Sequence, residues 1–536
     1  MKGILNDLKQ GLALPAAIRS FLAEPLTIAK AEEEVKTRLA NRERNFLDFV
    51  RAAVYERPES PYRRLLRIAG CELAELESEI HRHGLEPTLA KLAAAGVYLT
   101  SSEYKGKRPV VRGGESFYVA PEAFQGSLST PGYSTVTSGT SGAPMRSFRP
   151  VNRYVKAVST CVFLSAHDLL ARAHAMYDGV LPSGGGLSNL LVYAKLGIRT
   201  ERWFARRVPV GYLEGWKGYL STRAVVAAAR RSPAGFPTPQ PIDSGEVSII
   251  VRWLEAKRRS GALCCLTCAV SNAVRVARAA WEMGLSLEGT KFIVGGEPLT
   301  QAKNDLIERV GASAVCRFSS GLKANSTSAI GFGCAARQHV DEVHVHRHAL
   351  AVIPDPAQLD GIGPGRALMI TTLHRSSGKF FLNVQNGDYA TFEERRCGCD
   401  LDRLGLGLHL HHIRSYEKFT SEGMNYFYGD LHDFFESHLP REFGGAPGDY
   451  QLVEEEDGGG QTRLTLRVHP GVSGIDEQRL LARLREELGR GQRGNAFQAK
   501  IWGEAGTFRI SREMPHASPR GKILPLHFVR SRPDQG

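Results

Sequence analysis

The chain has 536 residues, of which 42% are hydrophobic and 23% are charged, and its formal net charge is +13. This length exceeds what one ordinary core organises, so we expect two or three domains with the composition of a soluble globular protein. The basic residues are scattered rather than interleaved with aromatic residues, which argues against nucleic-acid binding. No apolar run approaches the roughly 20 residues of a membrane helix. Polar residues interrupt the N-terminal stretch, so we expect no membrane association and no signal peptide.

The cysteine pattern argues against a secreted disulfide scaffold. The nine cysteines are odd in number and unevenly placed, which is not the pattern of small extracellular domains. We therefore expect a cytoplasmic protein. Cys264, Cys265 and Cys268 lie close together, but in an apolar run, where cysteine behaves as a small hydrophobic residue. We expect these three in a core strand rather than around a metal ion.

The N-terminal part of the chain is mostly helical in pattern. Apolar side chains recur at helical spacing in 73–83 and again in 89–95, with Gly84 and Pro87 between them. Residues 96–119 have the composition of short strands and turns. We expect residues 1–125 to be a helical lead-in that packs on the next domain.

Strand and helix patterns alternate in the middle of the chain. A helix is predicted from Tyr154 to the turn at Tyr177-Asp178-Gly179, where the glycine offers a stop, and another over 187–196. The alternation continues through 247–257, 263–266 and 271–283. This pattern predicts an α/β domain with helices that flank a largely parallel sheet.

Two predicted strands end in residues suited to a ligand. The apolar strand that begins at Lys291 ends in Gly-Gly-Glu-Pro, and the segment 379–388, which follows another strand over 367–373, ends at Asp388 in a turn. Ligands of open α/β sheets bind beyond the carboxyl ends of strands, so the first is a plausible pocket edge. A carboxylate such as Asp388 can accept hydrogen bonds from a pair of ribose hydroxyls. Ordinary strand-end turns explain both stretches as well.

The stretch 134–144, STVTSGTSGAP, combines hydroxyl residues with two glycines and a proline. Successive backbone N–H groups in such a turn can form an anion nest, and the hydroxyls add donors without bulk. No lysine follows the second glycine, so it is not the common P-loop. On these residues alone, a phosphate cradle and a polar surface turn are equally good interpretations.

Taken in order, these stretches resemble the motifs of the adenylate-forming ligase superfamily, which includes acyl-CoA synthetases, peptide-synthetase adenylation domains and luciferases. The branch of phenylacetate-CoA ligases and acyl-protein synthetases is the most similar. Residues 137–144 resemble its phosphate loop and 295–298 its adenine-side motif. Arg414 resembles its ribose and phosphate arginine, and 515–522 its terminal motif, whose lysine enters the active site. The resemblance covers roughly residues 130 to 530.

The resemblance implies a set of site residues. The catalytic residue would be Lys522. The nucleotide-binding residues would be Thr137, Ser138, Gly139, Thr140, Ser141, Gly142, Gly295, Gly296, Glu297, Pro298, Phe318, Ser319, Asp388 and Arg414. The substrate-binding candidates are Ser183, Gly184, Cys268 and Ser271.

The resemblance also implies the domain organisation. The class is α/β, with a large N-terminal adenylate-forming domain of mostly parallel sheets flanked by helices and a small mobile α+β C-terminal domain. We expect the lead-in over 1–125, the adenylation core over 126–415, and the mobile domain that carries Lys522 over 416–536.

The implied reaction is ATP-dependent activation of a carboxylic acid, aromatic or branched, as an acyl-adenylate, with Mg²⁺ as cofactor. The acyl group then passes to an acceptor, which the resemblance leaves open between CoA and an amine. A homodimer also stays open. One departure concerns the metal: the family's Mg²⁺-binding Glu corresponds to Leu322, and no carboxylate occurs between Glu308 and Asp341. A specialised biosynthetic enzyme for an unusual small acid, and a non-catalytic nucleotide-binding relative, are the alternatives.

A second site is predicted from cysteines and histidines. Cys397 and Cys399 flank one glycine, and Cys334 and His344 lie upstream. Three cysteines and one histidine make a ligand set suited to tetrahedral zinc, and the phenylacetate-CoA ligase branch has a similar arrangement. We expect a structural zinc rather than free thiols, with His339 in reserve for His344.

The remaining histidines carry no metal assignment. His409, His411 and His412 are expected to line the core or the substrate region.

Overall fold

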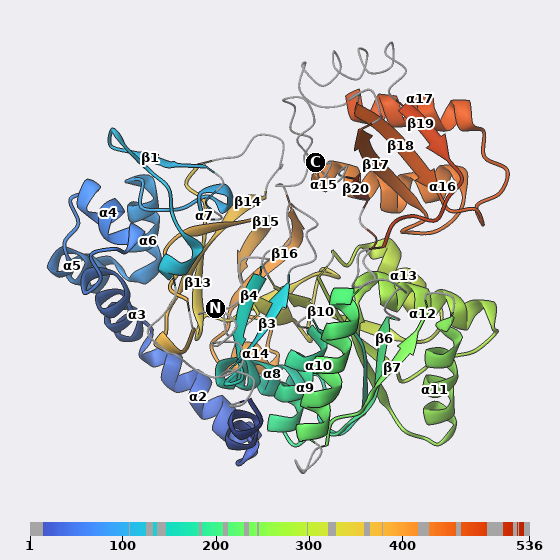
Figure 1. Cartoon of the computed structure of the whole chain (residues 1–536), viewed down its shortest axis with the longest axis horizontal. Helices are drawn as coiled ribbons and strands as arrows, with labels where there is room; N and C mark the ends of the chain where they lie inside the picture. Colours follow the sequence, from blue (N-terminus) through green and yellow to red (C-terminus); the bar gives the residue numbers. More distant parts are fainter. Residues whose placement is uncertain are drawn as a thin grey trace.

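The computed structural model describes residues 14–104, 106, 108–124, 132–136, 146–181, 185–206, 213–229, 235–243, 246–296, 298–319, 329–357, 365–377, 379–415, 428–456, 462–489, 508–517, 523 and 525–529. A large sheet dominates the centre of the molecule, and a smaller unit at the C-terminal end of the chain stands at one edge (Figure 1). The predicted α/β class, with a smaller C-terminal unit of helices and strands, is confirmed.

The central sheet has 12 strands in the order β13-β14-β15-β16-β12-β11-β10-β9-β8-β5-β6-β7. In this order, the strands from β10 to β7 pair with one another in parallel. The strands from β13 to β11 pair with one another antiparallel, and β11 also pairs antiparallel with β10. The parallel strands are β5 (Ala173–Tyr177), β6 (Thr200–Arg206), β7 (Pro239–Ile242), β8 (Cys264–Ala269), β9 (Lys291–Gly295) and β10 (Ser313–Phe318). The antiparallel strands are β11 (Gly331–Gly333), β12 (Val343–Val345), β13 (Leu350–Pro354), β14 (Arg366–Thr372), β15 (Val384–Glu394) and β16 (Leu408–Ser415).

The parallel half is buried on both faces, as its run of apolar residues requires. In β8, Leu266 packs with α11 (Ser248–Arg259) and α12 (Val270–Glu282), whereas Cys265 faces α8 (Tyr154–Ala166). Neighbouring residues of a strand point to opposite faces, so this alternation places helices on both sides. Cys264, Cys265 and Cys268 are buried in this strand, as expected from their apolar run. The other helices of this half are α9 (Gly185–Lys195), α10 (Leu213–Ala229) and α13 (Gln301–Glu308).

The N-terminal helices pack against the antiparallel half of the sheet. The buried apolar side chains of residues 46–124 share one core with residues of β13, β14 and β15, whereas α2 (Ile28–Ala40) packs on α8. The helical pattern expected over 73–95 is confirmed, with Gly84 at a φ of 83° between the two helices. The other elements of this part are α3 (Arg42–Val50), η1 (Arg51–Tyr55), α4 (Pro61–Ile68), α5 (Leu73–His83), α6 (Leu85–Ala94), α7 (Ser101–Tyr104), β1 (Val110–Arg112), β2 (Glu115–Phe117) and η2 (Pro121–Phe124).

Two expectations about element boundaries are wrong. The helix that begins at Tyr154 ends at Ala166, and the segment before Gly179 is instead β5. Asp168 follows the end of the helix and takes a φ of 54°, in the left-handed region, where a helix cannot continue. Residues 173–177 then form a strand, because they pair with β6 on one side and with β8 on the other. Asp388 likewise lies inside β15 rather than in a turn at the end of a strand. The residue before β15, Asn383, has a φ of 50°, and the extended strand begins only after it.

The C-terminal unit has a core of its own. Its 4-stranded sheet has the order β19-β18-β17-β20, and its buried apolar residues form a separate cluster. Its elements are α15 (Tyr428–Asp433), η6 (Phe434–His438), α16 (Leu439–Phe443), β17 (Tyr450–Glu456), β18 (Thr462–Val468), α17 (Glu477–Gly489), β19 (Phe508–Ser511) and β20 (Leu526–Val529).

Ion pairs join the C-terminal unit to the central part. Lys303 of α13 lies 2.9 Å from Glu436 of η6, and the two side chains are 3% and 2% exposed. Arg278 of α12 lies 3.0 Å from Asp449. Among the helices of the described ranges, none has the length and apolarity that crossing a bilayer demands.

Candidate nucleotide site and candidate metal centre

The predicted adenine-side residues lie at the ends of two neighbouring strands. Gly295 ends β9 and Phe318 ends β10, and the two strands are parallel, with Arg317 opposite Gly295. A Cβ atom at Gly295 would lie 2.6 Å from the carbonyl oxygen of Arg317, so no larger residue fits without displacing the backbone. Gly296 follows with a φ of 85°, in the region that favours glycine. Ligands of parallel sheets bind beyond such carboxyl ends.

Arg414 is held in place by a buried carboxylate. Its Nη1 atom donates to Oδ2 of Asp341 over 2.8 Å, and the side chains are 12% and 6% exposed. Its Nη2 atom lies 3.9 Å from Asp433 of α15, in the C-terminal unit. The Sγ atom of Cys316 in β10 donates to the carbonyl oxygen of Val340, the residue before Asp341, over 3.7 Å, so the pair lies close to the strand that ends at Phe318.

Asp388 lies on β15 beside the strand that carries Arg414. In the register of the two strands, Asp388 is opposite Ser415, and Tyr389 is opposite Arg414. The Nδ2 atom of Asn386 donates to Oδ2 of Asp388 over 2.8 Å. The structure thus places the two residues predicted for the ribose on adjacent strands.

Several predicted site residues lie outside the described residues. These are Thr137, Ser138, Gly139, Thr140, Ser141, Gly142, Ser183, Gly184, Glu297 and Lys522, as well as Leu322 and the side chain of Ser271. Pro298 and Ser319 follow the ends of β9 and β10. Cys268 is buried in β8, the neighbour of β9, with 3% of its surface exposed.

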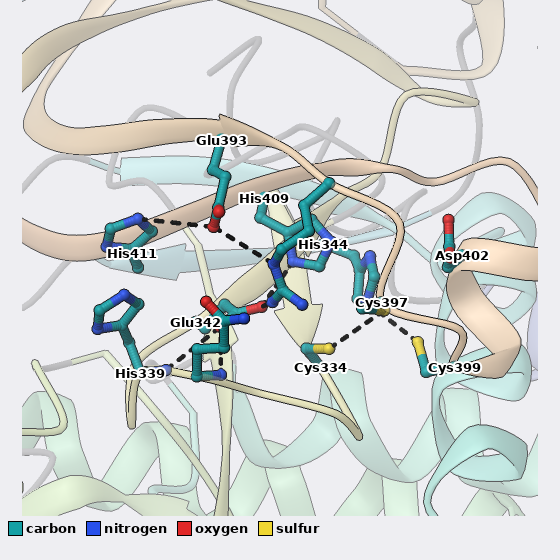
Figure 2. Close-up of polar contacts among 12 residues, drawn as sticks. Cys334, His339, Glu342, His344, Glu393, Cys397, Cys399, Asp402, His409 and His411 are labelled. Atoms are coloured by element: carbon teal, nitrogen blue, oxygen red, sulfur yellow. Dashed lines mark hydrogen bonds and ion pairs between the residues drawn. The ribbon is translucent and has the colours of Figure 1, made fainter.

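The four residues predicted for zinc come together. The ligand atoms of Cys334, His344, Cys397 and Cys399 all lie within 4.8 Å of one another (Figure 2). His344 is on β12, Cys334 follows β11, and the two other cysteines lie between β15 and α14 (Asp400–Arg403). His339, the reserve ligand, is not in this cluster.

The distances in this cluster fit a tetrahedral zinc site. The Sγ atoms of Cys334 and Cys397 are 3.6 Å apart, and Nε2 of His344 lies 3.7 Å from Sγ of Cys397 and 3.1 Å from Sγ of Cys399. With Zn–S near 2.3 Å and Zn–N near 2.0 Å, tetrahedral geometry requires about 3.8 Å between sulfurs and about 3.6 Å between sulfur and nitrogen. Nδ1 of His344 lies 2.6 Å from the carbonyl oxygen of Leu406. Donation to this oxygen leaves Nε2 with its lone pair directed at the thiols.

The electrostatics of the thiols also favour a cation. A hydrogen bond from Cys334, opposed by burial and assisted by His344, lowers the pKa of Cys399 to about 2. The hydrogen bond to Cys399, together with burial, raises the pKa of Cys334, and burial raises that of Cys397. Without a metal, one thiolate therefore opposes the ionisation of the others. A divalent cation removes this conflict, because it binds all three as thiolates.

A buried carboxylate supports the cluster from behind. Glu342 Oε1 lies 2.7 Å from Nδ1 of His409, whose ring packs on that of His344 at 4.1 Å between centroids. Glu342 also pairs with Arg395. Although burial alone would raise the pKa of Glu342, hydrogen bonds from His409 and the backbone N–H groups of Gln338 and His339, with the charge of Arg395, lower it to about 2.

Sequence reasoning did not identify these supporting residues. Glu342 is adjacent in sequence to the strand of His344, and His409 pairs with His344 across β12 and β16. Only the pairing of β12 with β16 brings His409 next to His344, and the spacing of these residues along the chain does not indicate it. His409 and His411 are buried as expected, whereas His412 is exposed.

Several solved structures are similar to this chain. The A-PCP part of McyG, complexed with phenylalanyl-adenylate, has a TM-score of 0.41 and 12% identity over 76% of this chain and 66% of that chain. O-succinylbenzoate coenzyme A synthetase from Bacillus subtilis, in complex with ATP and magnesium ion, has a TM-score of 0.42 and 14% identity over 73% of this chain and 68% of that chain. The amide bond synthetase McbA from Marinactinospora thermotolerans has a TM-score of 0.36 and 14% identity over 96% of this chain and 98% of that chain.

This chain spans about two thirds of the length of the first two of these proteins. No protein-family model and no curated protein matches the chain. The function is therefore argued from the chain's own residues.

Proposed function

We propose that the protein activates a carboxylic acid by ATP-dependent adenylation. The observation that carries this proposal is the arrangement of Gly295, Gly296 and Phe318 at the adjoining ends of two parallel strands, close to the buried pair of Asp341 and Arg414. A planar base can lie between the glycine backbone and the aromatic ring. Asp388 and Arg414, on neighbouring strands, can hold the ribose.

In the proposed reaction, a carboxylate oxygen attacks the α-phosphorus of ATP. The new oxygen–phosphorus bond forms the acyl-adenylate, the bond between the α-phosphorus and the bridging oxygen breaks, and pyrophosphate leaves. Catalysis of such a transfer depends on positioning and on neutralising charge. The hydroxyl and backbone N–H groups of 137–142 would hold the leaving phosphates, and Lys522 would bridge the α-phosphate and the carboxylate.

The metal requirement is the least usual part of the proposal. ATP reacts as its Mg²⁺ complex, but Leu322 supplies no ligand where the resembling family has a carboxylate. Glu297, two positions along the chain from the end of β9 at Gly295, is the carboxylate that would reach the metal on the phosphates. This departure favours a second candidate function, a nucleotide-binding relative without catalysis.

The second half of the reaction transfers the acyl group to CoA or an amine. Residues 400–536 contain no cysteine, so this part of the chain offers no thiol to carry an acyl group. We propose that the Cys₃His cluster holds a structural zinc, because four protein ligands leave no position for a substrate. It ties the loop between β15 and α14 to β12, which pairs with the strand of Arg414, and so suits a brace for the nucleotide site.

The test is acid-dependent pyrophosphate release by the full chain with ATP, Mg²⁺ and a panel of aromatic, branched and small carboxylic acids. We expect release with at least one acid, loss of release in Lys522→Ala, and normal release in the matched control Lys500→Ala. Product masses with CoA and with amines then identify the acceptor. ATP binding without acid-dependent pyrophosphate across the panel would establish the non-catalytic alternative.

A further inference from the structure

Three histidines gather beside the Cys₃His cluster without belonging to it. One ring nitrogen from each of His339, His411 and His412 lies within 4.8 Å of the others. The rings of His339 and His411 stack at 4.0 Å between centroids and 13° between planes, so their in-plane lone pairs run parallel, and His339 can share an ion with His411 only when its ring turns out of the stack. Nδ1 of His411 is 3.1 Å from Nδ1 of His412. Figure 2 shows His339 and His411 facing one another, on the other side of Glu342 from the cysteines.

A bulge in β16 brings the two neighbouring histidines together. Between the pairs Thr391–His411 and Tyr389–Arg414, β16 contains one residue more than β15. His412 takes a φ of 51°, which is uncommon for a residue other than glycine. Consecutive strand residues normally point to opposite faces, and a bulge re-aims one of them. Strain of this kind persists only where the surroundings hold it, and it is concentrated at functional sites.

A buried carboxylate holds the bulge. The two oxygens of Asp341 accept hydrogen bonds from the backbone N–H groups of His412 and Ile413, each over 3.0 Å. Asp341 is 4% exposed. This carboxylate therefore fixes the backbone of the bulge, and with it the directions in which the side chains of His411 and His412 leave the strand.

The third histidine and a nearby carboxylate complete the arrangement. The backbone N–H of His339 donates to Glu342 over 3.2 Å, which fixes its loop next to β16. Oε2 of Glu393 lies 4.0 Å from Nε2 of His411, the ring nitrogen that faces away from His412. Histidines that bind metals through one nitrogen commonly present the other to a carboxylate.

We propose that His339, His411 and His412 form a second metal site, which binds a divalent transition ion such as Zn²⁺. Imidazole nitrogens favour ions of this class, and three histidine ligands leave a fourth position for water. Tetrahedral bonds near 2.0 Å place two nitrogens about 3.3 Å apart, close to the 3.1 Å between His411 and His412. The exposed side chain of His412 gives the ion a route from solvent. This inference does not depend on the adenylation reaction.

The competing explanation is a hydrogen bond from one neutral ring to the other, with no ion. Co²⁺ distinguishes the two, because a site without sulfur gives ligand-field absorption but no thiolate-to-cobalt charge transfer. The experiment titrates Co²⁺ into the full chain after zinc has been supplied to the cysteines. We expect about one equivalent of cobalt to bind without a charge-transfer band.

His412→Gly is the decisive variant, because glycine adopts the left-handed backbone without strain and removes only the imidazole. We expect its cobalt affinity to fall by at least about tenfold, and that of His411→Gln to fall as well. His81→Gln, an exposed histidine of α5, is the matched control and should bind cobalt as the unaltered chain does. Zinc retained at the cysteines, measured by metal analysis of each variant, serves as an internal reference for folding. The proposal is overturned if the unaltered chain binds no cobalt outside the cysteines, or if His412→Gly binds it with unchanged affinity.

Discussion

The Nε2 atom of His344 lies 3.1 Å from the Sγ atom of Cys399, although 55 positions separate the two residues along the chain. The sheet creates this contact, because β12 pairs with β16 and β16 pairs with β15, whose end leads into the cysteine turn. Nδ1 of the same histidine is held by the carbonyl oxygen of Leu406. The ligand set is thus assembled by strand order and then fixed by one backbone contact.

We expect Cys399→Ser to lose the metal at this cluster. The unaltered chain should contain about one equivalent of zinc here, and the variant less than half of that, because a serine hydroxyl is a poor substitute for a thiolate. Metal binding contributes to the free energy of folding, so that free energy should fall by several kcal/mol. Metal analysis and urea unfolding provide the two measurements. Cys71→Ser, which changes a thiol outside the cluster, should alter neither, and equal zinc contents in the two variants would contradict the assignment.

We expect Glu342→Gln to weaken zinc binding without removing a ligand. The carboxylate orients His409 against His344, and glutamine cannot provide its charge. Loss of such supporting contacts typically lowers metal affinity by about 10- to 100-fold. Competition with a chelator measures the affinity. Glu394→Gln, at a side chain that is 63% exposed, is the control, and the idea fails if both variants have the same affinity.

The fold was predictable where a segment's own pattern decides its structure. The apolar spacing over 73–83 and 89–95 was sufficient to identify α5 and α6. The segment before Gly179 was predicted as helix but is β5, because its pairing with β6 and β8 outweighs its local pattern. The antiparallel half of the sheet was also beyond prediction, since strand order depends on contacts far apart in the sequence.

The candidate sites show the same division. The residues of the Cys₃His cluster were predictable from residue types and from the close spacing of Cys397 and Cys399. The histidine site was not, because it needs the bulge at His412, and the bulge arises only from the pairing of β15 with β16. Asp341 could not be assigned to Arg414 from the sequence for the same reason.

We expect Lys303→Met to open the contact between α13 and η6. The side chains of Lys303 and Glu436 are 3% and 2% exposed, so the variant leaves a buried carboxylate without its cation. Breaking a buried pair in this way costs about 3–5 kcal/mol. Hydrogen exchange over 434–438 should become faster, and the double variant Lys303→Met, Glu436→Leu should restore protection, because it removes both charges. Unchanged exchange in the single variant would show that the pair does not hold this contact.

We expect acid to destabilise the protein partly through His167. Burial lowers its pKa to about 4 from an ordinary value of 6.5, and Nε2 lies 2.8 Å from the carbonyl oxygen of Gly333. The unfolded chain therefore binds a proton that the folded protein does not, and the free energy of unfolding falls as the pH is lowered from 6.5 to 4.

Replacing His167 should flatten this dependence. In His167→Gln the slope should decrease by up to about 1.4 kcal/mol per pH unit, since one proton no longer takes part. Urea unfolding at a series of pH values measures the slope. His83→Gln, at an exposed position, should leave it unchanged, and an unaltered slope in His167→Gln would refute the role of this group.

We expect Arg414→Lys to raise the KM for ATP by about tenfold with a smaller effect on kcat. A lysine keeps the charge beside Asp341, so the bulge and its hydrogen bonds should survive. It lacks the planar fork that can contact a carboxylate and a ribose or phosphate oxygen together. The measurement is initial-rate pyrophosphate release with the acid identified above, alongside Arg67→Lys, whose side chain is 64% exposed. The role of Arg414 in ATP binding would be refuted if Arg414→Lys and Arg67→Lys had the same KM for ATP, because an arginine that binds the nucleotide through two hydrogen bonds cannot be replaced by lysine without loss of ATP affinity. Arg414 would then serve only the contact with Asp341.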